Sequence, residues 1–241
     1  MTHRLAIHGL TKRFGSKTVV NDVRFTADTG EVLGFLGPNG AGKSTTMKMI
    51  VGFLTPSAGT AVVCGHDVMT DPLAVKSVVG YLPEGAPAYP DMTPLTFLRF
   101  IAGVRGFDRS DRRDRVERVV AMTRIEDVAH QPIETLSKGF KRRVGLAQSL
   151  LHDPEVLILD EPTDGLDPNQ KLVVRELIRD MAKSKCIVIS THILEEVDAV
   201  CTRAMIIAQG QVVADGAPNE LKSQSGAGDL DEVFRKVTAD A

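Results

Sequence analysis

Residues 31–44, Glu31-Val-Leu-Gly-Phe-Leu-Gly37-Pro-Asn-Gly-Ala-Gly-Lys43-Ser44, decide the fold. The first half is a short apolar run typical of a buried strand, and the second half matches GxxxxGK(S/T), the pattern of a phosphate-binding loop. After Lys43, apolar residues recur at helical spacing, at Met47, Ile50 and Val51. A strand, a glycine-rich turn and a helix thus follow one another directly. This context favours a phosphate site over a plain glycine-rich turn.

The residue types of this loop suit a bound phosphate chain. Glycines let the backbone curl so that successive N–H groups and the helix N-terminus point at phosphate oxygens. Lys43 adds a point charge, and the Ser44 hydroxyl is a magnesium ligand in such loops. We therefore expect nucleotide binding by Gly37, Pro38, Asn39, Gly40, Ala41, Gly42, Lys43, Ser44 and Thr45.

A second apolar run ends in two acids. Val156-Leu-Ile-Leu-Asp160 reads as a buried strand whose last residue can hold magnesium directly or through water. Glu161, one residue beyond, can polarise a water molecule aligned with the terminal phosphate, which is a general-base role. Alternatively, Glu161 caps the turn before Pro162. The pairing with the phosphate loop favours the catalytic role.

The rest of the pattern predicts an α/β fold. Residues 4–36 contain short β segments, and the apolar runs 156–159 and 187–189 are typical of buried parallel strands. Residues 92–153 carry mainly helical patterns, which interrupt this core. We expect a P-loop NTPase core of mostly parallel sheet with helices, an antiparallel β N-terminal part and an inserted α-helical lobe at about residues 92–153.

The C-terminal residues are expected to be separate from the nucleotide-binding domain, which we place at residues 1–222. Residues 223–241 begin with Ser-Gln-Ser-Gly-Ala-Gly, a composition typical of a flexible linker. A short docking helix is predicted to follow, because apolar residues recur at i, i+3, i+4 and i+7, namely Leu230, Val233, Phe234 and Val237.

Within the expected helical lobe, residues 108–118 combine arginines with acids. Three acid-before-base pairs stand at i,i+4 spacing, which supports an exposed helix: Asp108 with Arg112, Asp111 with Arg115, and Asp114 with Arg118. An arginine-rich nucleic-acid patch is the alternative, but the interspersed acids favour a solvated helix face.

Composition and charge exclude several classes of protein. With 43% hydrophobic and 25% charged residues, the 241-residue chain is neither disordered nor collagen-like. Its 29 Lys and Arg against 31 Asp and Glu are too balanced for a broad nucleic-acid surface, so we expect no nucleic-acid partner. The cysteines lack zinc-site spacing, and neither a membrane-spanning apolar run nor a signal peptide is present. We expect reduced thiols and a cytoplasmic chain.

Three further motifs follow in the order found in the ATP-binding subunits of ABC transporters: Leu136-Ser-Lys-Gly-Phe140, Thr163-Asp-Gly-Leu-Asp167 and Ser190-Thr-His192. The chain resembles that family over roughly residues 3–220. The LSKGF segment, a glutamate at position 84 and a short C-terminal tail make it most similar to the ABC-2 export branch, which includes gliding-motility-type ATPases. Lys138 and Phe140 depart from the family's common LSGGQ.

The resemblance implies that each site is completed by a second subunit. Ser137 and Gly139 match the signature-loop positions that contact ATP bound to the opposing subunit, and Asp167 matches the acid that shapes the subunit interface. Standing alone, residues 136–140 read equally well as a helix cap followed by a basic turn.

Further roles come from the same resemblance. His192 matches a histidine that contacts the γ-phosphate and stabilises transition-state charge, although a lone strand-end histidine is usually structural. Phe14 stands where the family places an adenine-stacking aromatic, with a core phenylalanine as the alternative. Glu84 replaces the glutamine of the Q-loop, and its carboxylate can ligate magnesium or a magnesium-bound water.

The function implied is an ATP- and Mg²⁺-dependent motor, peripheral on the inner face of the cell membrane, that drives a separate permease through ATP-dependent dimerisation. A non-transport ABC ATPase acting on the ribosome or nucleic acid is the alternative. Such relatives carry two motif sets or very long coiled-coil insertions, whereas one compact set runs from Lys43 to Asp160 here. A regulatory module without turnover is disfavoured by Glu161 and His192.

Overall fold

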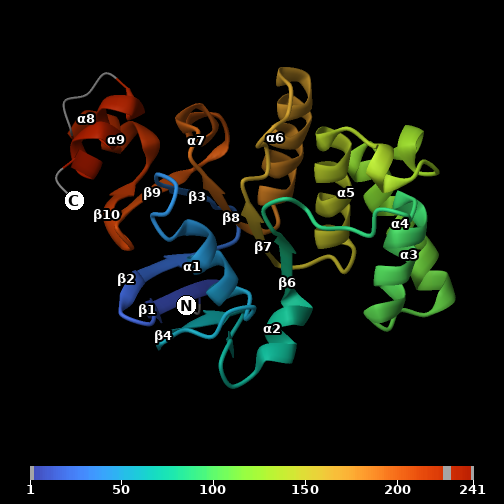
Figure 1. Cartoon of the computed structure of the whole chain (residues 1–241), viewed down its shortest axis with the longest axis horizontal. Coiled ribbons are helices and arrows are strands. Elements are labelled where there is room, and N and C mark those ends of the chain that lie inside the picture. Colours follow the sequence, from blue (N-terminus) through green and yellow to red (C-terminus); the bar gives the residue numbers. More distant parts are fainter. Residues whose placement is uncertain (1–2, 225–228, 240–241) are drawn as a thin grey trace.

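The computed structural model describes residues 3–224 and 229–239, in which two sheets pack with helices (Figure 1). The antiparallel sheet has the strand order β2 (Lys17–Ala27), β1 (Leu5–Phe14), β4 (Ala58–Val63) and β5 (His66–Asp67). The other sheet has the order β10 (Gln211–Gly216), β9 (Arg203–Ala208), β3 (Val32–Leu36), β8 (Cys186–Thr191), β7 (Val156–Asp160) and β6 (Val79–Leu82). Strands β9 to β6 are parallel and β10 pairs antiparallel with β9, so the predicted fold is confirmed.

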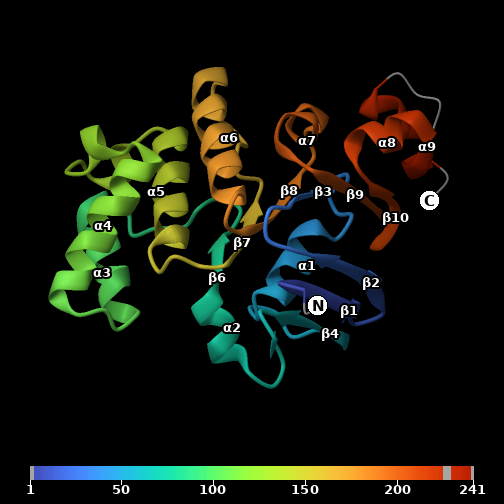
Figure 2. The same ribbon diagram turned by 180° about the vertical axis from the view of Figure 1, so that it is seen from behind.

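Helices cover both faces of the larger sheet. Helix α1 (Lys43–Ile50) lies between the two sheets, where Met47, Met49 and Ile50 are fully buried. Helices α6 (Pro168–Ala182) and α7 (Leu194–Val200) stand on the other face, as Figure 2 shows from behind. Helix α2 (Pro72–Val78) leads directly into the edge strand β6.

Strand β7 shows how the fold positions Asp160, the predicted magnesium ligand. Val156 and Ile158 pack in the core around α1, whereas Leu157 and Leu159 pack against the helices of the opposite face. Because side chains alternate along a strand, Asp160 falls on the α1 face. The strand therefore aims this carboxylate at the start of α1, where the phosphate loop ends.

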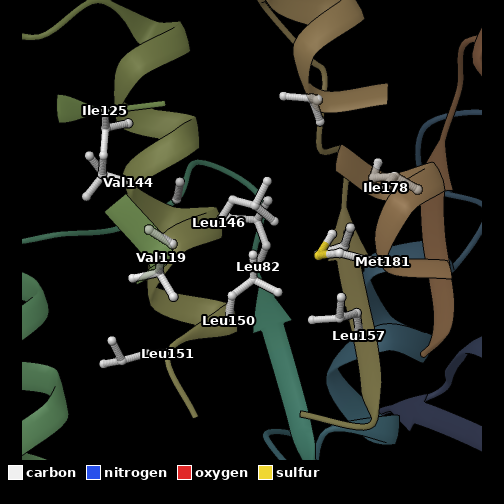
Figure 3. Packing of buried hydrophobic residues seen from close by; sticks show 14 of the residues in the cluster. Leu82, Val119, Ile125, Val144, Leu146, Leu150, Leu151, Leu157, Ile178 and Met181 are labelled. Atoms are coloured by element: carbon white, nitrogen blue, oxygen red, sulfur yellow. The ribbon is translucent and has the colours of Figure 1, made fainter. Parts of the chain in front are cut away.

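The predicted inserted helical lobe is confirmed as part of the fold. It consists of α3 (Pro94–Val104), α4 (Arg109–Thr123), α5 (Lys138–Leu150) and the short 3₁₀ turns Glu126–Val128 and Ile133–Thr135. The lobe shares its core with the sheet, since Val144 and Leu146 of α5 belong to the same buried cluster as Leu157 and Met181 (Figure 3). Burial of this common apolar surface fixes α5 relative to β7 and α6.

The ion pairs predicted along α4 are only partly right. Asp111 and Arg115 form the expected pair, with 2.9 Å between Oδ2 and Nε. Asp108 instead caps the helix by accepting a hydrogen bond of 2.9 Å from the N–H of Asp111. Arg118 pairs with Asp153 at 3.5 Å. Among the described residues neither Asp108 with Arg112 nor Asp114 with Arg118 forms an ion pair, although the charge of Arg112 still helps to lower the pKa of Asp108.

The C-terminal boundary also needs correction. Helix α8 spans Pro218–Gln224, so the predicted boundary between residues 222 and 223 falls inside a helix. The rest of the predicted linker, residues 225–228, lies outside the described residues. Helix α9 (Leu230–Ala239) follows at the place where a docking helix was expected. Its Leu230 and Val233 are buried in one cluster with Leu36 and Val197, whereas the side chain of Val237 lies outside the description.

Candidate active site

A cavity of about 300 Å³ opens over the phosphate loop. Its lining brings together the loop, the residue in the Q-loop position and the acid after β7: Val19, Asn39, Gly40, Gly42, Lys43, Ser44, Thr45, Glu84 and Glu161. The loop residues of this lining, Glu84 and Glu161 are far apart in the sequence, yet all line one cavity. The site residues predicted from separate motifs therefore meet.

The loop has its shape because two of its glycines fit where other residues do not. Gly42, the N-cap of α1, has φ of +105°, and a Cβ there would lie 2.7 Å from the carbonyl oxygen of Val19. A Cβ on Gly37 would lie 2.5 Å from the carbonyl oxygen of Ile207. The backbones of β2 and β9 thus pack so closely against the loop that no side chain fits at these two positions, and glycine is required.

Lys43 bridges the loop and the catalytic acid. Its Nζ donates to the carbonyl oxygens of Gly37 at 2.7 Å and Pro38 at 3.3 Å. The same Nζ lies 3.7 Å from Oε1 of Glu161, and both side chains are largely buried. A buried cation needs such partners because it has left water. Their arrangement holds the ammonium group at the cavity wall.

Asp160 is held beside Ser44 with one oxygen unsatisfied. The Ser44 hydroxyl donates to Oδ1 of Asp160 at 3.1 Å, and the Ser190 hydroxyl donates to the same oxygen. Register explains the second contact, because Asp160 and Ser190 are direct partners on β7 and β8. The other oxygen, Oδ2, is buried without a hydrogen-bond partner among the described residues. Buried carboxylate oxygens normally have partners, so Oδ2 fits a ligand position.

Glu161 adopts an unusual backbone conformation that is held from two sides. Its φ is +52°, a left-handed value that costs a non-glycine residue about 1 kcal/mol or more. Its N–H lies 3.1 Å from both the carbonyl and the hydroxyl oxygens of Ser190, and its carbonyl accepts a hydrogen bond from Arg142. The carboxylate contacts His192, with 3.0 Å between Oε2 and Nδ1. The carbonyl of Glu161 also accepts a hydrogen bond of 3.2 Å from the N–H of Asp164, so Glu161 closes the following turn through its backbone while its carboxylate contacts His192.

Two functional residues were missed from the sequence, Ser190 and Arg142. Arg142 is a buried residue of α5 that donates to the carbonyl oxygens of Pro83 at 3.2 Å, Asp160 at 3.3 Å and Glu161. Burial lowers the pKa of this guanidinium, and the nearby acids oppose that shift. Its only sequence signal was a run of basic residues. Ser190 was quoted within a motif without a role of its own.

The remaining predicted residues lie on three other elements. Phe14 is 51% exposed with the Lys12 ammonium 5.1 Å from its ring centroid, so the alternative of a core phenylalanine is wrong. Ser137 caps α5 and Asp167 caps α6, each accepting from a backbone N–H three residues later. Gly139 follows in α5, where a Cβ would lie 2.1 Å from Oε1 of Gln170. Figures 1 and 2 both place α5 in the helical lobe, away from α1.

Comparison with known proteins decides the family. A family model described as ABC transporter matches residues 20–164, more than half of the chain. The chain belongs to the ABC transporter family. It is an ATP-binding ATPase subunit of that family, as the resemblance implied.

Relatives of this ABC ATPase agree over nearly the whole chain. The Nod factor export ATP-binding protein I of Burkholderia lata is 39% identical over 224 residues, which is 92% of this chain and 74% of that protein. A solved ATP-binding subunit of an ABC transporter superposes with a TM-score of 0.87 at 30% identity, covering 97% of this chain and 99% of that one. CbiO1 from Clostridium perfringens, part of the transporter complex CbiONQ, gives 0.81 at 27% identity, with 99% and 96% covered.

Proposed function

We propose that this ABC ATPase hydrolyses Mg²⁺-bound ATP in the cavity above the phosphate loop and thereby drives a separate export permease. One observation carries the proposal. Lys43 and His192 both contact the carboxylate of Glu161, at 3.7 Å and 3.0 Å, at the place where Ser44 and Asp160 meet. A cation for phosphate, Lys43, and a base for water, Glu161, thus line one cavity, and His192, the donor for developing charge, contacts that base.

The donor set fits magnesium. The Ser44 hydroxyl and the unpartnered Oδ2 of Asp160 are hard oxygen ligands, and Glu84 lines the same cavity. Among the described residues no cluster of three or more His, Cys, Asp or Glu side chains could hold a metal, which suits an ion that takes most ligands from phosphate and water. Ser44 and Asp160 would hold the ion, which would supply positive charge to offset that of the bound phosphates.

The reaction assigns a separate task to each side chain. Lys43 binds the β- and γ-phosphate oxygens, and the loop N–H groups bind the rest of the phosphate chain. Glu161 accepts a proton from the attacking water, whose oxygen bonds to the γ-phosphorus as the bond to the bridging oxygen of ADP breaks. His192 stabilises charge on the γ-phosphate and holds the Glu161 carboxylate in place.

A second copy of the chain is proposed to complete the site. Ser137 and Gly139 are not among the residues that line the phosphate-loop cavity of their own chain. The family's signature loop contacts ATP on the opposing subunit, and the N-terminus of α5 offers a hydroxyl and helix N–H groups for that purpose. The exposed ring of Phe14 is the proposed adenine platform.

Coupling to a permease and the direction of transport rest on the relatives. The curated relatives are named as export ATP-binding proteins, and CbiO1 is part of a larger transporter complex. None of the helices in residues 3–224 and 229–239 has the length and apolar content to cross a bilayer. We therefore place the subunit at the inner face of the cell membrane, held there by its permease.

The test combines chemistry with capture of the partner. Full-length chain is purified and its ATPase rate measured with Mg²⁺, with EDTA, and with added DNA or RNA. We expect metal-dependent hydrolysis that nucleic acid leaves unchanged, and copurification of an integral membrane protein from detergent-solubilised membranes. Stimulation by DNA or RNA without a membrane partner would instead support a ribosome- or nucleic-acid-dependent ATPase.

A further inference from the structure

Glu196 is a buried carboxylate that the proposed reaction does not use. It stands in the first turn of α7 and is 2% exposed. Lys171 Nζ and Arg175 Nη2, both on α6, lie 3.9 Å from its Oε1. Both distances exceed hydrogen-bonding range, and Oε1 is buried without a hydrogen-bond partner among the described residues. The carboxylate is thus buried beside two cations without a hydrogen bond to either.

Three elements of the catalytic site meet at this carboxylate. Helix α7 begins two residues after His192, and α6 supplies the cations. Thr163, two residues after Glu161, is the third neighbour. Burial raises the pKa of Glu196, while the Thr163 hydroxyl and the two α6 cations oppose that rise.

We infer that Glu196 is a positioning residue, which fixes the helix after His192 against the segment after Glu161 and so maintains the contact between these two side chains. The inference rests on the proposed roles of Glu161 and His192. Glu161 directly follows β7 and His192 directly follows β8, and their side chains are in contact at 3.0 Å although His192 is partly exposed. The position of His192 therefore depends on how the segment before α7 is held. Glu196 is a buried group that connects α7 to the cations of α6 and to Thr163.

The adjacent acid provides a matched control. Glu195 also lies in the first turn of α7 and also pairs with Arg175, at 3.1 Å, but its side chain is 76% exposed. Both acids stabilise the N-terminus of α7 through the helix dipole, so Glu195→Gln removes one such contribution together with an exposed ion pair to Arg175. An exposed ion pair contributes little because water screens it, whereas a buried carboxylate leaves uncompensated cations when it is neutralised.

The experiment measures steady-state ATPase of the full chain for Glu196→Gln, Glu196→Asp and Glu195→Gln. Misplacing a catalytic group by about 1 Å costs up to about a hundredfold in rate. We expect kcat of Glu196→Gln to fall by about tenfold or more with KM for ATP nearly unchanged, Glu196→Asp to recover part of the loss, and Glu195→Gln to match the wild type. Thermal unfolding confirms that each variant is folded.

A double variant separates positioning from simple destabilisation. If Glu196 acts through His192, then Glu196→Gln combined with His192→Ala loses no more kcat than His192→Ala alone. Additive losses, or a wild-type kcat in Glu196→Gln, would overturn the inference. Failure of the proposed function looks different, because His192→Ala and Glu161→Gln would then keep the wild-type rate.

Discussion

Replacing Glu161 by glutamine tests the centre of the mechanism. The substitution keeps the size of the side chain and one oxygen that can face His192, but it removes the proton acceptor. General-base catalysis contributes about 10² to 10⁴ in rate, or about 3 to 5 kcal/mol of barrier. We therefore expect hydrolysis in Glu161→Gln to fall by at least about a hundredfold.

Binding of ATP should survive the same change. Lys43 Nζ and Glu161 Oε1 are 3.7 Å apart, and at an effective dielectric constant of about 20 their attraction is about 4 kcal/mol before desolvation is subtracted. Glutamine removes this competitor for the ammonium group, so phosphate binding is not weakened. Closure without hydrolysis should then accumulate a dimer with two trapped nucleotides.

The assay pairs single-turnover hydrolysis with size-exclusion chromatography of the ATP-loaded variant. Glu155→Gln is the matched control, because Glu155 stands at the opposite end of β7 and pairs with Arg4 at the surface. We expect wild-type turnover for the control and a trapped dimer for Glu161→Gln. Turnover at the wild-type rate in Glu161→Gln would remove that residue from the base role and refute the reasoning.

Three further outcomes are expected. Lys43→Ala should abolish ATP binding in a filter-binding assay, since it removes the cation held on the loop by Gly37 and Pro38; retained affinity would contradict this role. The chain should sediment as a monomer without nucleotide and as a dimer with ATP and Mg²⁺. A stable dimer without nucleotide would show that ATP binding is not what brings Ser137 of one subunit to the site of the other. Glu84→Gln should flatten the Mg²⁺ titration of ATPase and reduce transport in reconstituted complexes more than ATPase; identical metal curves with intact transport would make Glu84 an incidental loop residue.

The phosphate site was predictable because its determinants are local. GxxxxGK(S/T) and the apolar run ending at Asp160 each require a particular backbone within a few residues, and strand alternation then decides which face Asp160 occupies. The 3.1 Å contact between Ser44 and Asp160 joins two such local units. Parallel pairing of β3, β8 and β7 brings their C-terminal ends to one edge.

The errors have a common physical origin, because in each case the sequence pattern was a weak local signal and a stronger interaction overrides it. Asp108 was assigned to an i,i+4 pair worth about 0.2 to 0.5 kcal/mol, but a helix cap contributes about 1 kcal/mol, and the structure shows the cap. Likewise, the serine and glycine composition after residue 222 suggested a linker, yet Leu221 is buried and α8 continues through Gln224.

The contacts of Arg142 could not be predicted from the sequence, for a different reason. In the run Lys141-Arg142-Arg143 nothing distinguishes the residue that turns inward, and its partners are carbonyl oxygens, which leave no trace in a residue pattern. Only the common core of α5, β6 and β7 aims this guanidinium at the backbone of Pro83 and Glu161. Three-dimensional packing thus supplies a contact that no motif encodes.

That contact joins the two halves of the proposed site. Helix α5 begins at the Ser137 cap, which is expected to meet ATP on a partner subunit, and Arg142 lies in the same helix. Its guanidinium holds the carbonyl of Glu161 while that residue keeps its left-handed φ of +52°. The same group holds Pro83, the residue before Glu84. Because Ser137 caps the helix that carries Arg142, we expect a displacement of Ser137 on meeting a partner's nucleotide to reach the backbone of Glu161 through Arg142.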